Sequence, residues 1–327
     1  MAHIVLGIGT SHTPMLNAPL QDWPRFIDRD QHRQYIELGG QPMSYAQLLA
    51  RAPKEIASQL EPQILADRYA RAQAEVEQLG QTLRAAQLDA LIIVGDDQKE
   101  LYHDDNMPSI LIYRGQTIRN TPLTEHPGPD WARAASALYY EPQVPREYPV
   151  HLDLANHLVE CLMAHEFDLS VADRIAQGKG EGHAFGFVHR RLLLGSNLPV
   201  VPIFLNTYYP PNQPSPARCY KLGQAIAAAV QAWPGDARVG IIASGGLSHF
   251  LVDEPLDQRV MDALRQQDEA AIAAIPRNKL NSGNSEIRNW ICMAGAARHL
   301  SLQKMSYIPA YRTAAGTGTG LCFASWQ

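Results

Sequence analysis

The chain has 327 residues, of which 46% are hydrophobic and 19% are charged, a balance typical of globular proteins. Its formal net charge of -5 and its lack of a basic cluster argue against nucleic acid as the main partner. No apolar run approaches the roughly 18 residues that span a bilayer, and the N-terminus lacks a signal-peptide pattern. We therefore expect no membrane partner and a cytoplasmic location.

The cysteines indicate a reducing compartment. The chain has four, far apart and without a Cys-x-x-Cys pair: Cys161, Cys219, Cys292 and Cys322. This spacing is typical of reduced, mostly buried residues and does not favour a zinc site.

Short β-branched apolar runs alternate along the chain with segments of helical periodicity. The runs predict core strands over residues 4–8, 90–94, 109–113, 169–172, 200–205 and 239–243. The periodic segments predict helices over residues 64–86, 153–164, 217–233, 256–275 and 286–299. This alternation is typical of an α/β fold with a central mixed or mostly parallel sheet flanked by helices.

No domain boundary is evident, so we expect a single catalytic domain over residues 1–327. Residues 19–62 contain polar turns and little periodicity, which indicates an excursion over one face, either a lid or an interface element. The proline-rich residues 208–214 lie between a predicted strand and a predicted helix, and we interpret them as an ordered loop.

Four segments place a possible ligand or acid/base group after an apolar run. The first leads into Ser11-His12-Thr13-Pro14 and the second into Asp96-Asp97-Gln98. The third, less regular, leads through the glycine-rich residues 178–182 to His183, and the fourth through Gly245-Gly246-Leu247-Ser248 to His249. Since parallel strands end at one edge of a sheet, these groups are expected to converge on one cleft. Histidine there can bind a metal or transfer a proton.

Each feature also has a purely structural interpretation. His12 can be a hydrogen-bonded loop residue, Asp96-Asp97 a solvated turn, and His249 a capping residue. Glu286 opens a predicted helix, where a glutamate commonly does no more than complement the helix dipole. Its functional interpretation is a carboxylate directed into the cleft.

The chain resembles the class III extradiol ring-cleavage dioxygenases, in particular those that open protocatechuate, gallate and 3-O-methylgallate. The resemblance covers nearly the whole chain and is most specific in the N-terminal Ser-His and the Gly-Gly-x-Ser-His segment. The matching segments are Ser11-His12, residues 94–108, residues 153–157, His183, residues 206–223, residues 245–249, residues 282–296 and residues 307–310.

The resemblance implies a site for Fe(II), held by two histidines and one glutamate with positions left open for substrate and dioxygen. Carried over by motif, His12 is the first metal ligand and Glu286 the carboxylate ligand. His249 matches the acid/base histidine of the family. His183 matches a second active-site histidine that contacts substrate or bound oxygen.

The second histidine ligand is where the chain departs from the family. Asp97 and Pro108 fit the surrounding pattern, and Gln98 stands where the histidine is expected. Three outcomes stay open: Gln98 is a weak metal ligand, His103 or Asp96 substitutes for it, or the site holds no iron. A glutamine amide is a weaker ligand than imidazole for this metal.

The resemblance implies oxidative cleavage of a catechol-type aromatic acid, with His249 moving the proton and His183 orienting the oxygen species. Tyr209, Arg218 and Arg312 are candidates to bind a substrate carboxylate or methoxy group. We also expect a homo-oligomer, or a partnership with a separate small helical subunit. Two other functions stay open: a metal-poor protein that binds aromatic acids or a partner, and a non-oxidative metal-assisted lyase or hydrolase.

Overall fold

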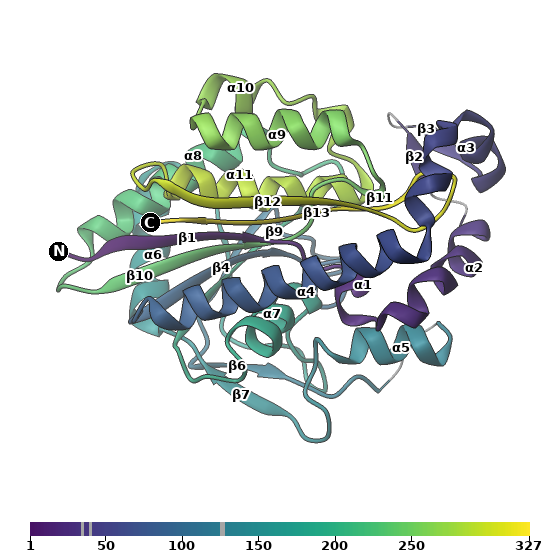
Figure 1. Cartoon of the computed structure of the whole chain (residues 1–327). Helices are drawn as coiled ribbons and strands as arrows, with labels where there is room; N and C mark the ends of the chain where they lie inside the picture. Colours follow the sequence, from purple (N-terminus) through teal and green to yellow (C-terminus); the bar gives the residue numbers. More distant parts are fainter. Residues whose placement is uncertain (34–35, 39–40, 125–127) are drawn as a thin grey trace.

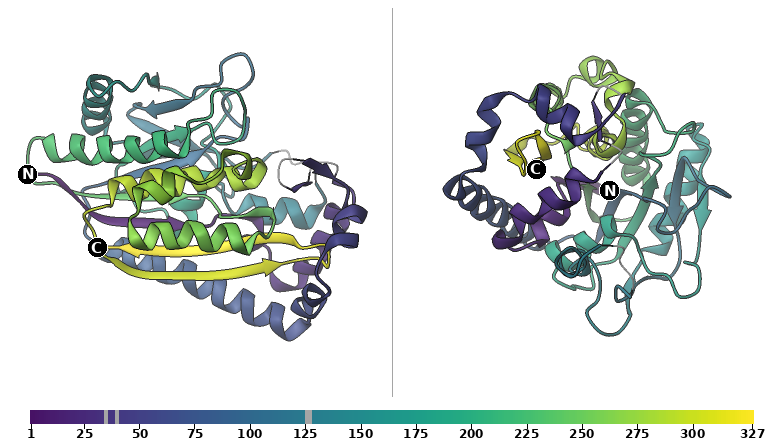
Figure 2. Two further views of the ribbon diagram at one scale, coloured as in Figure 1. Left: turned by 90° about the horizontal axis from the view of Figure 1, so that it is seen from above. Right: turned by 90° about the vertical axis from the view of Figure 1, so that its right-hand side faces the viewer.

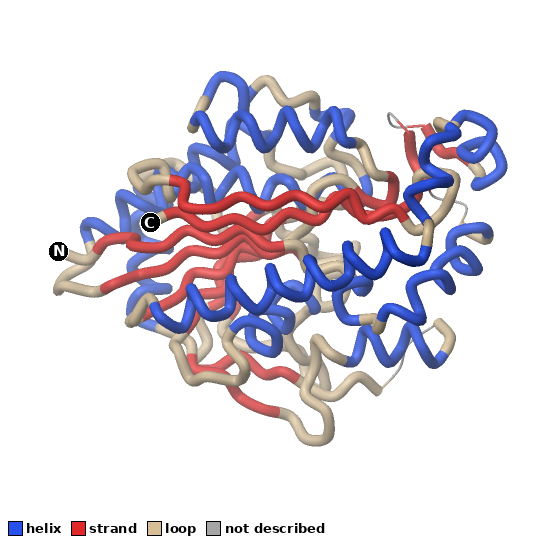
Figure 3. The backbone as a smooth tube through the Cα atoms, viewed as in Figure 1, coloured by secondary structure: helices blue, strands red, loops and turns tan. Residues whose placement is uncertain are grey.

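The structure is a computed structural model, which describes residues 1–33, 36–38, 41–124 and 128–327. Its centre is a sheet in which the described residues form nine strands (Figures 1 and 3). The four middle strands run parallel and lie in the order β1 (His3–Thr10), β10 (Arg238–Ser244), β4 (Ala90–Asp96) and β9 (Val200–Leu205). The predicted α/β fold with a mixed, largely parallel central sheet is confirmed.

The outer strands make the sheet mixed. β5 (Ile110–Tyr113) pairs antiparallel with β9, and β8 (Ser170–Ala172) then pairs parallel with β5. At the opposite edge, β13 (Thr317–Trp326) runs antiparallel to β1, and both β11 (His249–Leu251) and β12 (Leu302–Tyr311) pair with β13.

Both faces of the sheet are covered, which explains the continuous apolar runs in the sequence. Every residue of β4 is buried; Ile92 and Val94 pack on one side, and Leu91 and Ile93 on the other.

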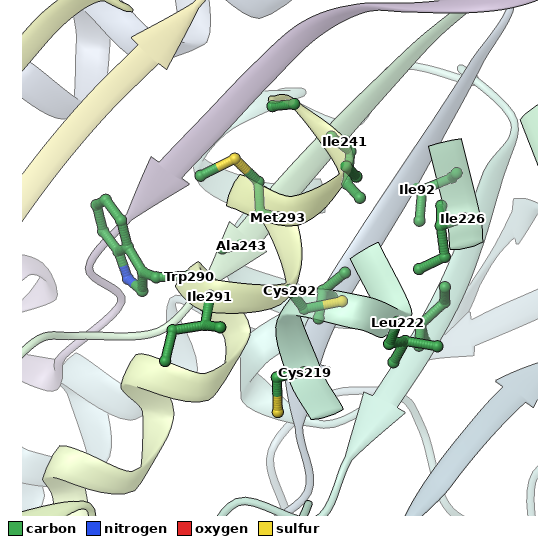
Figure 4. Close-up of a cluster of buried hydrophobic side chains, with 14 of the residues drawn as sticks. Ile92, Cys219, Leu222, Ile226, Ile241, Ala243, Trp290, Ile291, Cys292 and Met293 are labelled. Atoms are coloured by element: carbon green, nitrogen blue, oxygen red, sulfur yellow. The ribbon is translucent and has the colours of Figure 1, made fainter. Parts of the chain in front are cut away.

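One face packs against α6 (Leu152–Ala164), α8 (Pro216–Ala232) and α11 (Ile287–Ala296), with α9 (Glu254–Gln266) and α10 (Glu269–Ala273) outside them. Figure 4 shows Ile92 and Ile241 of the sheet facing Leu222 of α8 and Cys292 of α11. Gly223 lets the two helices approach closely, because a Cβ atom there would lie 1.9 Å from the carbonyl oxygen of Cys292.

The other face is covered by the long helix α4 (Pro62–Ala85) and by α7 (His183–Phe187), as Figure 2 shows from two further directions. Their neighbours are α1 (Pro14–Asn17), α5 (Asp130–Ala137) and the π-helical turn η3 (Val188–Leu192). A separate two-stranded sheet is formed by β6 (Thr117–Asn120) and β7 (Arg146–Pro149). None of the helices in the described part of the chain is long and apolar enough to cross a membrane.

The predicted strands and helices occur where the patterns place them, with one correction. Residues 256–275 were expected to form one helix, but α9 ends at Gln266 and α10 begins at Glu269. Gln267 adopts a left-handed conformation with φ of 52°, and the Asp268 side chain caps α10. The polar residues Gln267 and Asp268 therefore end one helix and begin the next, although the apolar spacing continues across them.

Residues 19–62 contain short elements, in keeping with their weak periodicity. They fold into η1 (Leu20–Arg25), α2 (Phe26–Gln31), β2 (Ile36–Leu38), β3 (Gln41–Met43), α3 (Tyr45–Arg51) and η2 (Lys54–Leu60). In Figure 1 they gather beyond the carboxyl ends of β1, β4 and β10. The carboxylate of Asp30 anchors them there through a buried ion pair with Arg312, which follows β12. The remaining short turns are η4 (Arg277–Lys279) and η5 (Ser282–Glu286).

Candidate metal centre

A cavity of about 270 Å³ lies at the carboxyl ends of the central parallel strands. Such a volume is at the small end for small-molecule sites and suits a single-ring ligand. All five residues assigned to the site from the sequence line it: His12, Gln98, His183, His249 and Glu286.

Parallel pairing explains how distant segments meet here. Thr10, the last residue of β1, lies beside Ser244, the last residue of β10, and β4 lies on the other side of β10. His12 and Gln98 each follow two residues after a strand end. The expected convergence at one sheet edge therefore occurs for these segments.

His183 reaches the cavity by another route. The strand before it, β8, lies at the far edge of the sheet and is parallel to β5, which opposes the central strands. The glycine-rich segment between β8 and α7 carries the chain back, so that His183 is the first residue of α7. His183 therefore lies in the expected cavity. It does not reach the cavity from the end of a central parallel strand, as was expected from the sequence.

Glu286 lies at the junction of η5 and α11, with 1% of its surface exposed. Its Oε2 accepts a hydrogen bond of 2.7 Å from the backbone N–H of Gly246. Gly245 leaves room for this approach, because a Cβ atom there would lie 3.0 Å from the Cβ of Glu286. The glycine pair after β10 thus positions the carboxylate.

Ser244 fixes the orientation of His12. The Ser244 hydroxyl donates to the carbonyl of Ala184, so it accepts from Nδ1 of His12 at 3.0 Å. Nε2 of His12 then carries a lone pair, which lies 3.2 Å from Oε2 of Glu286. Among the described residues this buried nitrogen has no hydrogen-bond partner. Burial lowers the pKa of His12, which favours the neutral, metal-binding form.

His183 is oriented by Glu100. Nδ1 of His183 lies 2.8 Å from Oε2 of Glu100, and the same carboxylate accepts the backbone N–H of His183. Burial alone would lower the pKa of His183, but Glu100 raises it to about 10. Since Nδ1 donates to the carboxylate, Nε2 is the atom available to a metal. This carboxylate–histidine arrangement is common beside metal ligands.

Gln98 presents its amide nitrogen to the centre of the cluster. Nε2 lies 3.2 Å from both Oε1 of Glu286 and Oδ2 of Asp96, and 3.4 Å from Nε2 of His183. In this orientation Gln98 acts as a hydrogen-bond donor to the site. Burial, and then the charge of Glu286, raise the pKa of Asp96 to about 8.

His249 faces the cavity from the start of β11. Its Nδ1 donates to the carbonyl of Leu247 at 2.9 Å, and its Nε2 lies 3.1 Å from Oε1 of Glu286. Burial opposes protonation, but the carboxylate of Glu286 raises the pKa of His249. Glu286 shows the reverse effect, since the charge of His249 lowers its pKa well below the usual value against the effect of burial.

Three other sequence candidates lie outside the cavity, and one lines it. His103 is exposed, Arg218 is exposed over the ring of Phe167, and Tyr209 packs under Lys99, and these three do not line the cavity. Arg312 lines it, but both oxygens of Asp30 are bound to its guanidinium.

Four functional candidates were missed: Arg29, Arg33, Glu100 and Tyr208. Tyr208 donates to Oε1 of Glu286 at 3.1 Å from the loop after β9. That loop follows a predicted strand, so its place at the shared sheet edge is a signal that could have identified Tyr208. The arginines lie in the aperiodic residues 19–62, where the sequence carries no comparable signal.

The donor set fits a divalent metal. One ligand atom from each of His12, His183 and Glu286 lies within 4.8 Å of the other two. Imidazole and carboxylate donors in this number suit a non-haem Fe(II) centre with open positions. The unpartnered Nε2 of His12 beside a carboxylate oxygen supports this fit, because a cation satisfies both atoms.

Comparison with known proteins agrees with the geometry. A gallate dioxygenase of Pseudomonas putida is 37% identical over 112 residues, 32% of this chain and 31% of the relative. A 2,3-dihydroxyphenylpropionate/2,3-dihydroxicinnamic acid 1,2-dioxygenase of Comamonas testosteroni is 35% identical over 100 residues, 30% of this chain and 29% of the relative. Each alignment thus spans less than a third of the relative's length.

The family described as the catalytic LigB subunit of aromatic ring-opening dioxygenases matches residues 68–321, which is more than half of the chain. The match includes Gln98, His183, His249 and Glu286, while His12 lies before it. The resemblance recognised in the sequence is confirmed: the chain belongs to the LigB family of aromatic ring-opening dioxygenases.

Proposed function

We propose that the protein cleaves the ring of a catechol-type aromatic acid, such as protocatechuate, gallate or 3-O-methylgallate, in an extradiol reaction that uses dioxygen and Fe(II). The observation that carries this proposal is the convergence of His12, His183 and Glu286 beside His249 in one small cavity. Membership of a ring-opening dioxygenase family supports it.

We assign the metal ligands to Nε2 of His12, Nε2 of His183 and the carboxylate of Glu286. His183 replaces Gln98 in this role because imidazole is the stronger ligand and because Gln98 presents an N–H group. When bound, Fe(II) supplies positions for the substrate oxygens and dioxygen together and conducts electron density between them.

His249 is the proposed acid/base residue. Because its Nδ1 donates to the carbonyl of Leu247, its Nε2 is the atom that can accept a proton from a substrate hydroxyl. The same nitrogen can return a proton later in the reaction, as suits an imidazole. Its position beside Glu286 keeps it next to the proposed metal ligands.

Gln98 and Tyr208 are proposed to hold Glu286 in place. Both donate to Oε1 of Glu286, at 3.2 Å and 3.1 Å, while Gly246 donates to Oε2. Three donors on one carboxylate fix its plane and leave little freedom for rotation. We further propose that residues 1–327 act as one catalytic domain, in a homo-oligomer or with a separate small subunit.

Gln98 favours one competing function, a metal-poor protein that binds aromatic acids without turnover. The decisive experiment loads the protein with Fe(II) under anaerobic conditions and measures metal content, then oxygen uptake with protocatechuate, gallate and 3-O-methylgallate. We expect about one iron per chain and a ring-opened product. A folded protein that retains no iron supports the competitor, and turnover without oxygen supports a lyase or hydrolase.

A further inference from the structure

The cavity lining also carries cationic side chains. Three arginines line the cavity: Arg29 and Arg33 from the excursion, and Arg312 from the C-terminal hairpin. A site that exposes such charge to a ligand attracts anions.

Among the described residues, Arg312 has the closest ion pair of the three arginines. Both carboxylate oxygens of Asp30 contact Arg312, at 2.5 Å and 2.9 Å. Arg29 lies farther from the same carboxylate, with its Nε 3.8 Å from Oδ1. The carboxylate of Asp30 therefore pairs more closely with Arg312 than with Arg29.

Arg29 and Arg33 keep unused hydrogen-bond donors. Within the described residues, Nε of Arg29 and Nη1 of Arg33 are buried and have no hydrogen-bond partner. Arg33 lies over the ring of Phe250, with 3.7 Å between the guanidinium carbon and the ring centroid. This contact orients the guanidinium and leaves the Nη1 donor free.

The electrostatic environment also favours a negative charge beside these arginines. Burial, and then the positive charge of Arg312, lower the pKa of Arg29 to about 9, and the same two causes lower the pKa of Arg33. A bound anion would reverse both effects, because it supplies the opposite charge and satisfies the donors.

We propose that Arg29 and Arg33 form the subsite for the carboxylate of the substrate. This inference rests on the proposed function, whose substrate is an aromatic acid. Guanidinium groups suit the role, since their planar N–H donors match the two oxygens of a carboxylate.

The contacts of Tyr208 relate this subsite to the proposed metal ligands. Tyr208 lines the same cavity and hydrogen-bonds to Glu286, and it also interacts electrostatically with Arg33. Tyr208 thus contacts one proposed metal ligand and also lies near one of the arginines. A ring between the metal ligands and the arginines would direct its hydroxyls toward His12 and Glu286 and its carboxylate toward the arginines.

The test compares an acid with its neutral amide. Isothermal titration calorimetry on the metal-free protein measures the Kd of 4-hydroxybenzoate and of 4-hydroxybenzamide. We expect the wild-type protein to prefer the acid, and Arg33→Gln and Arg29→Gln each to weaken binding of the acid by roughly 10- to 100-fold. Binding of the amide should change little. Arg133→Gln on α5, an exposed arginine, is the matched control and should keep the preference.

Equal affinity of the wild-type protein for acid and amide overturns the subsite, whether or not the variants fold. A preference that survives in both folded variants also overturns it. Failure of the proposed function has a different signature. In that case the metal-free protein still prefers the acid and loses this preference in the variants, but the iron-loaded protein consumes no oxygen.

Discussion

Nε2 of His12 faces Oε2 of Glu286 at 3.2 Å, and within the described residues that nitrogen has no hydrogen-bond partner. Ser244 holds the other ring nitrogen, and Gly246 donates to the carboxylate oxygen. Two electron-pair donors are thus fixed toward each other by separate elements. Without a cation, the nitrogen lone pair and the carboxylate oxygen repel each other. A divalent cation would attract both, which makes this pair the most specific feature of the site.

Substitutions of His183 and Gln98 test which of the two is the metal ligand beside His12 and Glu286. We expect His183→Gln to lose most bound Fe(II), because only His12 and Glu286 of the proposed set remain. Gln98→Ala should retain iron near the wild-type stoichiometry. Elemental analysis after anaerobic loading and desalting measures both. Iron lost from the Gln98 variant and kept in the His183 variant would show that Gln98 is the ligand.

Glu100 is expected to tune the metal site without touching the metal. Its carboxylate accepts from Nδ1 of His183 and also from the hydroxyl of Tyr140. Glu100→Gln keeps an acceptor but removes the charge, so iron affinity should fall by about 10- to 100-fold. Competition with a chelator gives the affinity. The control is Glu147→Gln, which alters an exposed ion pair with Arg119 and should leave iron affinity unchanged.

His249 is expected to affect turnover far more than metal binding. His249→Gln should lower kcat by about 10²- to 10⁴-fold, the usual contribution of acid/base catalysis, while iron content stays near that of the wild type. Steady-state oxygen uptake and metal analysis on the same preparation check both halves. An unchanged kcat in an iron-loaded variant contradicts the assignment.

The buried pair of Asp30 and Arg312 should be the main electrostatic anchor of the excursion. The two side chains are 0% and 2% exposed. Asp30→Asn leaves the guanidinium of Arg312 buried without its counter-charge, so the free energy of unfolding should fall by about 3–5 kcal/mol. Asp22→Asn removes a partly exposed ion pair with Arg25 in the same segment and should cost less than about 1 kcal/mol. Denaturant titration compares the two variants.

The sequence predicted those parts of the site that directly follow an apolar strand. β1, β4 and β10 are apolar because helices cover both faces, so the positions of His12, Gln98 and the segment leading to His249 followed from their strand ends. Glu286 was a candidate from its place at a helix start, and the family resemblance supplied its role and that of His249.

Other features depend on tertiary contacts that leave no local pattern. The contact of Glu100 with His183 joins residues 83 positions apart, and the ion pair of Asp30, which lies near Arg29 and Arg33 in the chain, with Arg312 joins residues 282 positions apart. The β12–β13 hairpin was not predicted. All ten residues of β13 are buried, but its Gly-, Thr- and Ser-containing sequence does not form a continuous apolar run.

Asp257 should make stability depend on pH. It is buried at the start of α9 and accepts hydrogen bonds from the backbone and hydroxyl of Ser248 and from the hydroxyl of Tyr307. Burial raises the pKa of Asp257 to about 6 from its usual 3.8, despite those hydrogen bonds, and the nearby Asp253 adds to the rise.

Because the folded-state pKa is the higher one, the folded state favours the protonated carboxyl. Its stabilising contribution is complete below about pH 4 and is lost as the pH rises through about 6. Asp257→Asn mimics the protonated form, so its free energy of unfolding relative to the wild type should rise by about 2 kcal/mol between pH 4 and pH 7. Urea titrations of both proteins across this range measure the difference. A difference that stays constant with pH contradicts the raised pKa, and one that falls contradicts its sign.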